Sequence, residues 1–300
     1  MICDKLDAEG ITLLRAAGFE VDIKLDHTPE TLKEAVKDYD AVIVRSKTKI
    51  TKDIIGAMER TKVVARAGVG LDNIDAEAAK RKGIKVLNSP EAVTQSTAEL
   101  TLALLFALVR QVPYADLCVK GGEWPKSKLI GRELGGKTLG IIGFGRIGYL
   151  VAKVAKALGM RVLAYDVVDR DVAMRELGVE KATFDGLLKE SDIITLHATL
   201  TPKSRYIIGR RELAMVKRGA ILINAARGGL IDEEALREAL TSGQLAGAAF
   251  DVCEVEPPQK RDLICLPNVV CTPHIGAQTE EAQKRASVMI AQKVIEELKR

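Results

Sequence analysis

A glycine-rich turn between two short apolar segments constrains the fold of this chain more than any other feature. Residues 138–142 are mostly apolar, the turn Gly143-Phe144-Gly145-Arg146-Ile147-Gly148 follows directly, and residues 149–158 carry apolar side chains at helical spacing. Gly159 ends the helical pattern, and residues 161–165 form a second apolar run. This order predicts a βαβ unit with two parallel strands.

The turn has the spacing Gly-x-Gly-x-x-Gly, in which each glycine has a physical reason. Gly143 permits the tight turn, Gly145 lets a phosphate approach the backbone, and Gly148 allows the helix to pack closely on the strand. The N-terminus of the following helix would offer free amides and a positive dipole end to an anion. Chance glycines also satisfy this spacing, so a turn without a ligand is the alternative. With both flanking strands present, the pattern predicts a dinucleotide site.

An acidic residue closes the second strand of this unit. Asp166 lies 18 residues after Gly148, where a carboxylate binds the adenosine ribose hydroxyls and repels a 2′-phosphate. The next two residues, Val167 and Val168, provide no arginine that could receive such a phosphate. The sequence therefore predicts NAD rather than NADP as the cofactor.

Similar apolar runs alternate with helical patterns along the rest of the chain. Most runs are continuous rather than alternating, which is typical of parallel strands covered on both faces. We therefore expect an α/β fold with doubly wound parallel sheets. Strands are predicted at 20–24, 41–45, 62–67, 85–87, 138–142, 161–165, 193–197, 220–224, 247–252 and 269–271. Helices are predicted at 75–82, 232–242 and 279–299 among others.

One long apolar segment interrupts this alternation. Ser96-Thr97-Ala98-Glu99 has the pattern of a capping box, with Ser96 as the N-cap of a helix that runs toward Val119. We interpret this helix as the connector from a first α/β domain to a second one. The boundary between them is predicted after residue 92.

Composition excludes several classes of protein. The net charge is only +4 and basic residues alternate with acids, which argues against a nucleic-acid-binding protein. No apolar run reaches about 18 uncharged residues, and no signal peptide is visible, so we expect no membrane association. The five cysteines form no CxxC pair and have no metal-ligand spacing with histidine. We expect a reduced, cytoplasmic protein without a metal site.

Polar residues follow three of the later predicted strands, where ligands bind in open α/β sheets. Arg227 lies in the segment 224–229, Glu256 lies in the acidic segment 251–258, and His274 follows the strand at 269–271. A histidine–carboxylate pair beside an arginine suits proton transfer coupled to hydride transfer. The alternatives are a surface ion pair for Arg227 and solvated loop charges for the acids. His27 and His197 are expected to be structural, although His197 could flank the cofactor.

Five motifs in order resemble the D-isomer-specific 2-hydroxyacid dehydrogenases, and among them most closely the phosphoglycerate dehydrogenases. The resemblance covers essentially the whole chain. It implies a Rossmann NAD-binding domain at 93–276 and a flavodoxin-like, discontinuous substrate domain at 1–92 and 277–300. It also implies a homodimer joined through the NAD-binding domains. The motifs are 66–75, 143–148, 224–229, 251–258 and 273–276.

The resemblance also implies a role for each site residue. Arg227 would bind the substrate carboxylate and carbonyl, His274 would be the acid/base, and Glu256 would orient the histidine. The residues implied around NAD are Gly143, Gly145, Arg146, Ile147, Gly148, Asp166, Ala225, Ala226, Arg227, Asp251, His274 and Gly276. One departure concerns the amino terminus, where only Met1-Ile2-Cys3 precedes Asp4 and the first strand is expected to be truncated.

A small-molecule substrate with a phosphate calls for cations near the first-domain loops. Arg45 and Arg66 are the candidates, with the Gly68 and Val69 backbone beside them; exposed basic loops are the alternative. The leading hypothesis is NAD-dependent oxidation of 3-phospho-D-glycerate to 3-phosphohydroxypyruvate, in serine biosynthesis. The second is reduction of glyoxylate or hydroxypyruvate, and a third is an NAD-sensing, corepressor-like binding protein.

Overall fold

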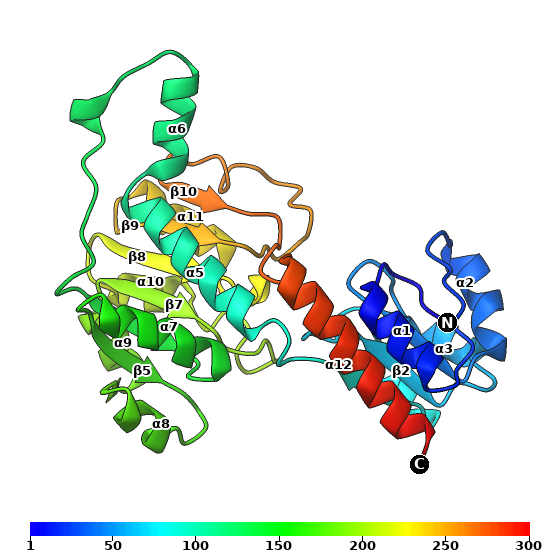
Figure 1. Ribbon diagram of the computed structural model, residues 1–300. Coiled ribbons are helices and arrows are strands. Elements are labelled where there is room, and N and C mark those ends of the chain that lie inside the picture. The colour runs from blue at the N-terminus through cyan, green and yellow to red at the C-terminus, as the bar shows by residue number, and fades with distance from the viewer. The chain divides into compact units, whose positions relative to one another are not determined.

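The computed structural model describes residues 1–300, and the chain divides into two compact units. Unit 1 comprises Met1–Ser96 and Ala277–Arg300, and unit 2 comprises Thr97–Gly276. The sequence placed the two boundaries after residues 92 and 276. Each unit has a parallel sheet with helices packed on it (Figure 1), so the predicted α/β class is confirmed.

Unit 2 contains a seven-stranded parallel sheet in the order β10-β9-β8-β7-β4-β5-β6. Beginning at β4, the chain adds β5 and β6 on one side and then returns to add β7 to β10 on the other. This is the doubly wound Rossmann order with one further strand. The strands are β4 (Thr138–Ile142), β5 (Arg161–Tyr165), β6 (Glu180–Lys181), β7 (Ile193–Leu196), β8 (Ala220–Asn224), β9 (Leu245–Phe250) and β10 (Val269–Cys271).

The helices of unit 2 cover both faces of this sheet, because its strands are apolar on both. In β8, Ala220 and Leu222 pack into one core cluster, whereas Ile221 and Ile223 pack into the other. Period-two alternation explains why one continuous apolar run serves two cores. The helices are α5 (Thr94–Val109), α6 (Val112–Lys120), α7 (Arg146–Ala157), α8 (Asp171–Glu176), α9 (Phe184–Glu190), α10 (Arg210–Met215) and α11 (Glu233–Thr241).

Unit 1 contains a smaller parallel sheet in the order β1-β2-β3. Ile2 forms parallel bridges to Ile23 and to Ile43 in β1, which extends the order to 23, 2, β1, β2, β3. That order is the flavodoxin-like one. The elements are α1 (Ala8–Ala16), α2 (Pro29–Ala35), β1 (Ala41–Val44), α3 (Lys52–Ala57), β2 (Val63–Arg66), α4 (Ala76–Arg81), β3 (Lys85–Asn88) and α12 (Glu280–Leu298).

The C-terminal helix α12 returns to unit 1 and packs beside α1. Their shared apolar residues, among them Leu14, Ile290 and Val294, cover one face of the sheet. The approach is close at Gly10, where an added Cβ would lie 2.2 Å from Ser287 Oγ. Helices α2, α3 and α4 contribute to the core on the other face.

Three local predictions were wrong in detail. The strand predicted at 20–24 is only the bridge at Ile23, since its partner segment is as short as the sequence indicated. Ser96 does not cap α5, which already begins at Thr94; the Ser96 hydroxyl instead donates to Val93 O within the first turn. The long helix also ends at Val109, because Gln111 adopts a left-handed conformation and α6 begins at Val112, with Pro113 in its first turn.

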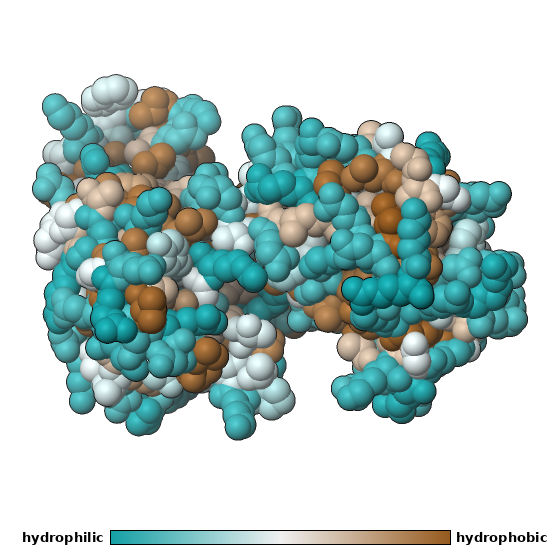
Figure 2. All heavy atoms as spheres, turned by 60° about the horizontal axis from the view of Figure 1, so that its bottom comes forward, coloured by the Kyte–Doolittle hydropathy of each residue, from teal (hydrophilic) through white to brown (hydrophobic).

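No single helix is long and apolar enough to cross a bilayer. Helices α5 and α6 meet the length and composition requirement only as a pair, and they are bent by 62° relative to each other. The face drawn in Figure 2 is mostly hydrophilic, with hydrophobic side chains scattered among charged ones. This agrees with the solvated surface expected from the charge pattern.

Candidate active site

The predicted site residues of unit 2 gather at the carboxyl edge of its parallel sheet. The glycine turn follows β4, Asp166 follows β5, Arg227 follows β8, and His274 follows β10. Strands β4 and β7 are neighbours, and the chain direction of the winding reverses between them. Ligands bind at such a switch point in open α/β sheets.

The glycine turn has the geometry that a dinucleotide requires. Gly143 has φ +93°, and a Cβ there would lie 2.7 Å from the backbone of His197. A Cβ on Gly148 would lie 2.5 Å from Gly143 O, so α7 packs directly on the turn. A Cβ on Gly145, in contrast, would meet nothing within 4 Å, and no side chain caps α7 at this residue. The turn therefore leaves room and amides for a pyrophosphate at Gly145.

Asp166 points from the end of β5 to the glycine turn. Its carboxylate accepts hydrogen bonds from the amide of Phe144 at 2.8 Å and from that of Val168 at 2.9 Å. This orientation suits a carboxylate that binds ribose beside the turn. Arg170, which was not predicted to lie near the site, lies 4.0 Å from Asp166. A cation is therefore present near this carboxylate, two residues beyond Val168.

The loop after β8 is held by the last residue of that strand. The buried Asn224 accepts a hydrogen bond from the Ala226 amide at 3.0 Å and donates to Arg227 O at 2.9 Å. The Arg227 guanidinium donates to Ala226 O at 2.7 Å. Ala225 is buried beneath the loop. Asn224 thus fixes the backbone from which Arg227 extends.

Asp251, at the end of β9, organises the loop that carries His274. Its side chain is buried, and one oxygen accepts hydrogen bonds from Thr272 Oγ1 at 2.6 Å and the Ile275 amide at 2.8 Å. The other oxygen accepts from the Gly276 amide at 2.8 Å. His274 itself has φ +55°, an uncommon conformation that this loop maintains. Asp251 therefore holds both sides of His274.

Glu256 and His274 form a hydrogen-bonded pair, as expected for an acid/base histidine with an orienting carboxylate. The distance from His274 Nδ1 to Glu256 Oε2 is 2.7 Å. The second oxygen, Oε1, accepts from the Cys253 amide at 3.1 Å. Both side chains are partly exposed. The pair leaves Nε2 as the ring nitrogen that can exchange a proton with a ligand.

The surroundings of Glu256 favour its ionised form. Partial burial alone would raise its pKa, but the hydrogen bond and charge of His274, the Cys253 amide and the charge of Arg227 outweigh burial. The pKa of Glu256 is therefore lowered from its ordinary value of 4.5. The carboxylate is charged at neutral pH, which is the form that accepts a hydrogen bond from Nδ1–H.

The predicted substrate residues lie in unit 1, at the carboxyl edge of its sheet. Arg45 follows β1 and Arg66 ends the neighbouring β2. Asn73 links their loops by donating to Arg45 O at 2.7 Å and to Thr48 O at 2.6 Å. The buried Asp4 also fixes the loop that carries Arg45, because its carboxylate accepts hydrogen bonds from the amides of Arg45 and Thr48. Burial lowers the pKa of Arg45, with Asp4 opposing that shift.

The loop at Gly68 and Val69 is fixed by residues at the end of β3. Ser89 Oγ accepts from the Gly68 backbone amide at 3.0 Å, and the Asn88 side-chain Nδ2 donates to Val69 O at 2.6 Å. The Arg66 guanidinium folds over the same loop and donates to Gly70 O. Unit 1 therefore brings Arg45, Arg66, Gly68 and Val69 into one group of linked loops.

The two remaining histidines differ in their surroundings. His27 Nε2 lies 3.1 Å from Thr48 Oγ1 and 3.3 Å from Cys3 O, a structural position under the Arg45 loop. His197 follows β7, and its Nδ1 is buried without a hydrogen-bond partner. Burial lowers the pKa of His197 to about 4, so its ring is neutral at physiological pH. Its backbone lies against Gly143, which makes it a neighbour of the glycine turn.

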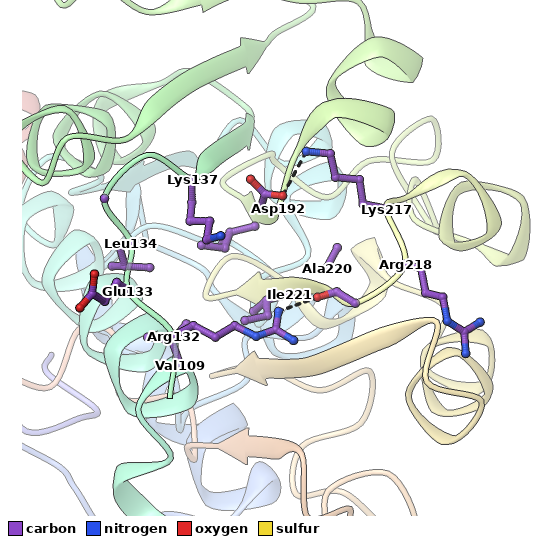
Figure 3. Close-up of a pocket in the computed structure, with 13 residues that line it drawn as sticks. Val109, Arg132, Glu133, Leu134, Lys137, Asp192, Lys217, Arg218, Ala220 and Ile221 are labelled. Carbon is purple, nitrogen blue, oxygen red and sulfur yellow. Dashed lines mark hydrogen bonds and ion pairs between the residues drawn. The ribbon is translucent and has the colours of Figure 1, made fainter. Parts of the chain in front are cut away.

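A cavity of about 590 Å³ lies at the opposite, amino edge of the same sheet (Figure 3). Asp192 accepts from the Thr138 amide at 2.9 Å and from Lys217 at 3.0 Å. Arg132 donates to Gly219 O at 2.8 Å, and Arg218 points away from the other labelled residues. These hydrogen bonds connect the residues at the starts of β4, β7 and β8. None of the predicted site residues lines the cavity. We interpret it as structural.

Several residues of the site were not identified from the sequence. Asn224, Thr272 and the Cys253 amide act through hydrogen bonds to a loop or a side chain, not through a charged group of their own. The only available signal was their position, because each follows or ends a strand of the sheet. Arg170 lies four residues after Asp166, and its positive charge is the signal that could have indicated it.

Comparison with known proteins identifies the family. Residues 102–276 match the family model described as D-isomer specific 2-hydroxyacid dehydrogenase, NAD binding domain. The chain belongs to this family. The matched region contains the glycine turn, Asp166 and the Glu256–His274 pair, and the cofactor of the family domain is the predicted NAD.

Three relatives are informative about this chain. It is 49% identical over 296 residues to a D-3-phosphoglycerate dehydrogenase of Methanocaldococcus jannaschii, covering 98% of this chain and 56% of that relative. It is 48% identical over 299 residues to a hydroxypyruvate reductase of Thermotoga maritima, covering 98% and 96%. The chain thus spans about half the length of the first relative and nearly all of the second.

A solved structure supports the same relationship at the level of the fold. The D-lactate dehydrogenase of Aquifex aeolicus, solved with NAD and lactic acid, has a TM-score of 0.87 and 32% identity, covering 98% of this chain and 94% of that one. The Rossmann domain expected from the glycine turn is therefore confirmed.

The glycine turn provides a matched pair of variants. We expect Gly148→Ala to lower the free energy of unfolding by about 1–3 kcal/mol, because its Cβ would overlap Gly143 O. Gly145→Ala should leave stability within about 0.5 kcal/mol but raise the Kd for NAD about tenfold, since the methyl group fills the space for a phosphate. Thermal unfolding and calorimetric titration with NAD measure both effects. Unchanged NAD affinity in Gly145→Ala would contradict the assignment of the turn.

Proposed function

We propose that this chain is an NAD-dependent dehydrogenase that oxidises 3-phospho-D-glycerate to 3-phosphohydroxypyruvate. The observation that carries the proposal is the 2.7 Å hydrogen bond between Glu256 and His274 in the NAD-binding unit, with Arg227 close enough to lower the pKa of Glu256 further. This combination provides an acid/base and a carboxylate-binding cation. The choice of substrate is supported by the phosphoglycerate dehydrogenase names of several relatives.

In the proposed reaction each side chain has one task. Arg227 binds the substrate carboxylate by paired hydrogen bonds and polarises the neighbouring C–O bond. His274 Nε2 takes the proton of the substrate hydroxyl, while the Glu256 carboxylate accepts the Nδ1–H hydrogen bond and stabilises the imidazolium that forms. Bound NAD supplies the hydride acceptor. The reverse reaction returns the proton from His274 to the carbonyl oxygen.

The residues proposed to hold NAD are those at the carboxyl edge of unit 2. The amides at Gly145, Arg146 and Ile147 would bind the pyrophosphate, because α7 has no side-chain cap there. Asp166 would bind the adenosine ribose. Ala225, Ala226 and Gly276 belong to loops that Asn224 and Asp251 hold in place, so their backbones offer a fixed surface to the cofactor.

Arg45 and Arg66 are proposed as the cations for the substrate phosphate, beside the Gly68 and Val69 backbone. Two arginines on neighbouring strand ends can bind several phosphate oxygens at once. Arg66 also contacts Asp72 at 3.7 Å, which limits its net positive charge. Arg45 therefore carries more of the proposed selectivity.

A second candidate function is reduction of hydroxypyruvate. The observation in its favour is that the Thermotoga maritima hydroxypyruvate reductase matches over 96% of its own length. The same acid/base pair and arginine serve both reactions. Only the phosphate separates the two substrates, so the choice depends on the cations of unit 1.

We also propose that the chain forms a homodimer through unit 2. Helix α6 and the following loop extend beyond the sheet of this unit (Figure 1), and Leu117, Trp124 and Ile130 are between 68% and 81% exposed. Exposed apolar side chains at this density mark an interface in soluble proteins. A cavity of about 330 Å³ beside Tyr114, Val269 and Val270 offers the same unit a recess with both apolar and polar lining. A protrusion and a recess on one surface suit a two-fold dimer.

Glu256→Gln tests the acid/base assignment. We expect turnover with NAD and the hydroxy acid to fall about 100-fold, because glutamine cannot stabilise the imidazolium. Glu254→Gln, on the same loop, should retain activity, since the Glu254 side chain contacts Tyr206 instead of the histidine. Activity of His274→Asn equal to that of the unchanged chain would contradict the mechanism.

The Glu256→Gln variant should also change how the free energy of unfolding depends on pH. Because the pKa of Glu256 is lowered on folding, its ionised form stabilises the fold above the ordinary carboxyl value of 4.5. That contribution is lost as the pH falls through the lowered pKa. The difference in unfolding free energy between the unchanged chain and Glu256→Gln should therefore shrink on acidification.

Arg45→Ala tests the proposed phosphate site. We expect the KM for 3-phosphohydroxypyruvate to rise about tenfold, while the KM for hydroxypyruvate stays unchanged, because the variant loses one charged hydrogen bond to phosphate. Arg60→Ala, which removes an exposed arginine paired with Asp40, is the control. Equal effects on both substrates would remove Arg45 from the phosphate site. Preference of the unchanged chain for hydroxypyruvate would favour the second function.

Leu117→Glu tests the proposed dimer. We expect the unchanged chain to show twice the mass of one chain by light scattering, and the variant to shift toward the mass of a single chain, since a charge in the apolar contact is costly. Val172→Glu alters an equally exposed valine on α8 and should stay dimeric. A single-chain mass for the unchanged protein would refute the proposal.

A further inference from the structure

Two cysteine side chains lie together beside the Glu256–His274 pair, and the proposed reaction uses neither of them. Cys271 ends β10, where it is paired in register with Phe250 of β9, and Cys253 lies three residues after Phe250. Val269 and Cys253 pack against the same core cluster. Cys271 is two residues after Val269 and therefore points to the same face of the sheet. Both thiols therefore lie on one face of the sheet, and each side chain shifts the pKa of the other.

The two cysteines differ in reactivity. Cys271 is exposed, whereas Cys253 is only partly exposed. The hydrogen bond from Cys253 lowers the pKa of Cys271, against the opposing effects of burial and of Asp251, Glu233 and Glu256. The same hydrogen bond, together with burial, raises the pKa of Cys253. Cys271 is thus the more accessible thiol and the one that an oxidant reaches first.

Hydrogen bonds connect the segments that carry both cysteines to the Glu256–His274 pair. The Cys253 amide donates to Glu256 Oε1, and Thr272, next to Cys271, donates to Asp251, which holds the His274 loop. The Cys253 backbone also packs tightly on the residue after Arg227, since a Cβ on Gly228 would lie 2.1 Å from Cys253 C. A disulfide between Cys253 and Cys271 would therefore shift the backbone that contacts Glu256 and the backbone that packs on Gly228.

We propose that Cys253 and Cys271 form a redox-active dithiol that closes to a disulfide and thereby lowers the activity of the Glu256–His274 pair. The oxidant is a peroxide. The Cys271 thiolate attacks one peroxide oxygen, the O–O bond breaks, and Cys271 becomes a sulfenic acid as hydroxide leaves. The Cys253 sulfur then attacks the Cys271 sulfur, its proton and the hydroxyl leave as water, and the S–S bond forms. A dithiol reductant reverses the change.

The test uses the full chain with Cys265→Ser, because Cys265 is a second exposed thiol and would complicate the assignment. This chain is treated with a stoichiometric amount of hydrogen peroxide and compared with its reduced form. We expect the loss of two free thiols, a peptide that contains Cys253 linked to one that contains Cys271, and a fall in kcat/KM of about tenfold or more. Dithiothreitol should restore both thiols and activity.

Two further variants serve as controls. Cys271→Ser and Cys253→Ser, each compared with its own untreated form, should keep their activity after the same treatment and form no intramolecular link. Thiol counting and peptide mapping do not depend on the substrate, so they test the dithiol even if the proposed function fails. Absence of the Cys253–Cys271 link, or a link that leaves kcat/KM unchanged, overturns the proposal.

Discussion

The candidate site depends above all on the buried carboxylate of Asp251. Three hydrogen bonds from Thr272, Ile275 and Gly276 converge on it, and they hold His274 in a backbone conformation that a free loop would rarely adopt. A buried charge is tolerated here because donors surround both oxygens. Glu256 needs one further contact. Its Oε1 accepts a hydrogen bond from the Cys253 amide, which orients Oε2 toward the imidazole of His274. The chemistry of the loop therefore rests on a group that need not touch substrate.

The fold followed from the sequence because both sheets obey one rule. Continuous apolar runs separated by helical patterns allow few arrangements other than parallel strands covered on two faces. The glycine turn then fixed the position of the cofactor domain, since its three glycines have steric reasons that the structure reproduces at Gly143 and Gly148. Where a predicted helix boundary was wrong, the local backbone conformation decided where the helix ends. The break after Val109 depends on the left-handed Gln111 before Pro113, and the pattern of apolar residues continues across it.

The candidate site was partly predictable for a similar reason. Ionisable residues at strand ends, such as Arg227 and His274, stand out because such groups need a partner or a ligand. Residues that act through neutral hydrogen bonds do not stand out. Asn224 holds the Arg227 loop by bonds to two backbone groups, and an asparagine in that position is equally common as a turn former. Arg170 was missed because a bend at residues 167–168 brings this cation within 4.0 Å of Asp166.

The two edges of the unit 2 sheet differ in how their polar groups are satisfied. At the amino edge, Asp192 and Arg132 complete their contacts within the unit, with Lys217, the Thr138 amide and Gly219 O. At the carboxyl edge, the uncapped start of α7 and the buried Nδ1 of His197 lack such partners. Polar groups that a fold leaves without partners cost stability, and they are retained where a ligand completes them. Hydrogen-bond satisfaction therefore assigns the amino edge to stability and the carboxyl edge to function.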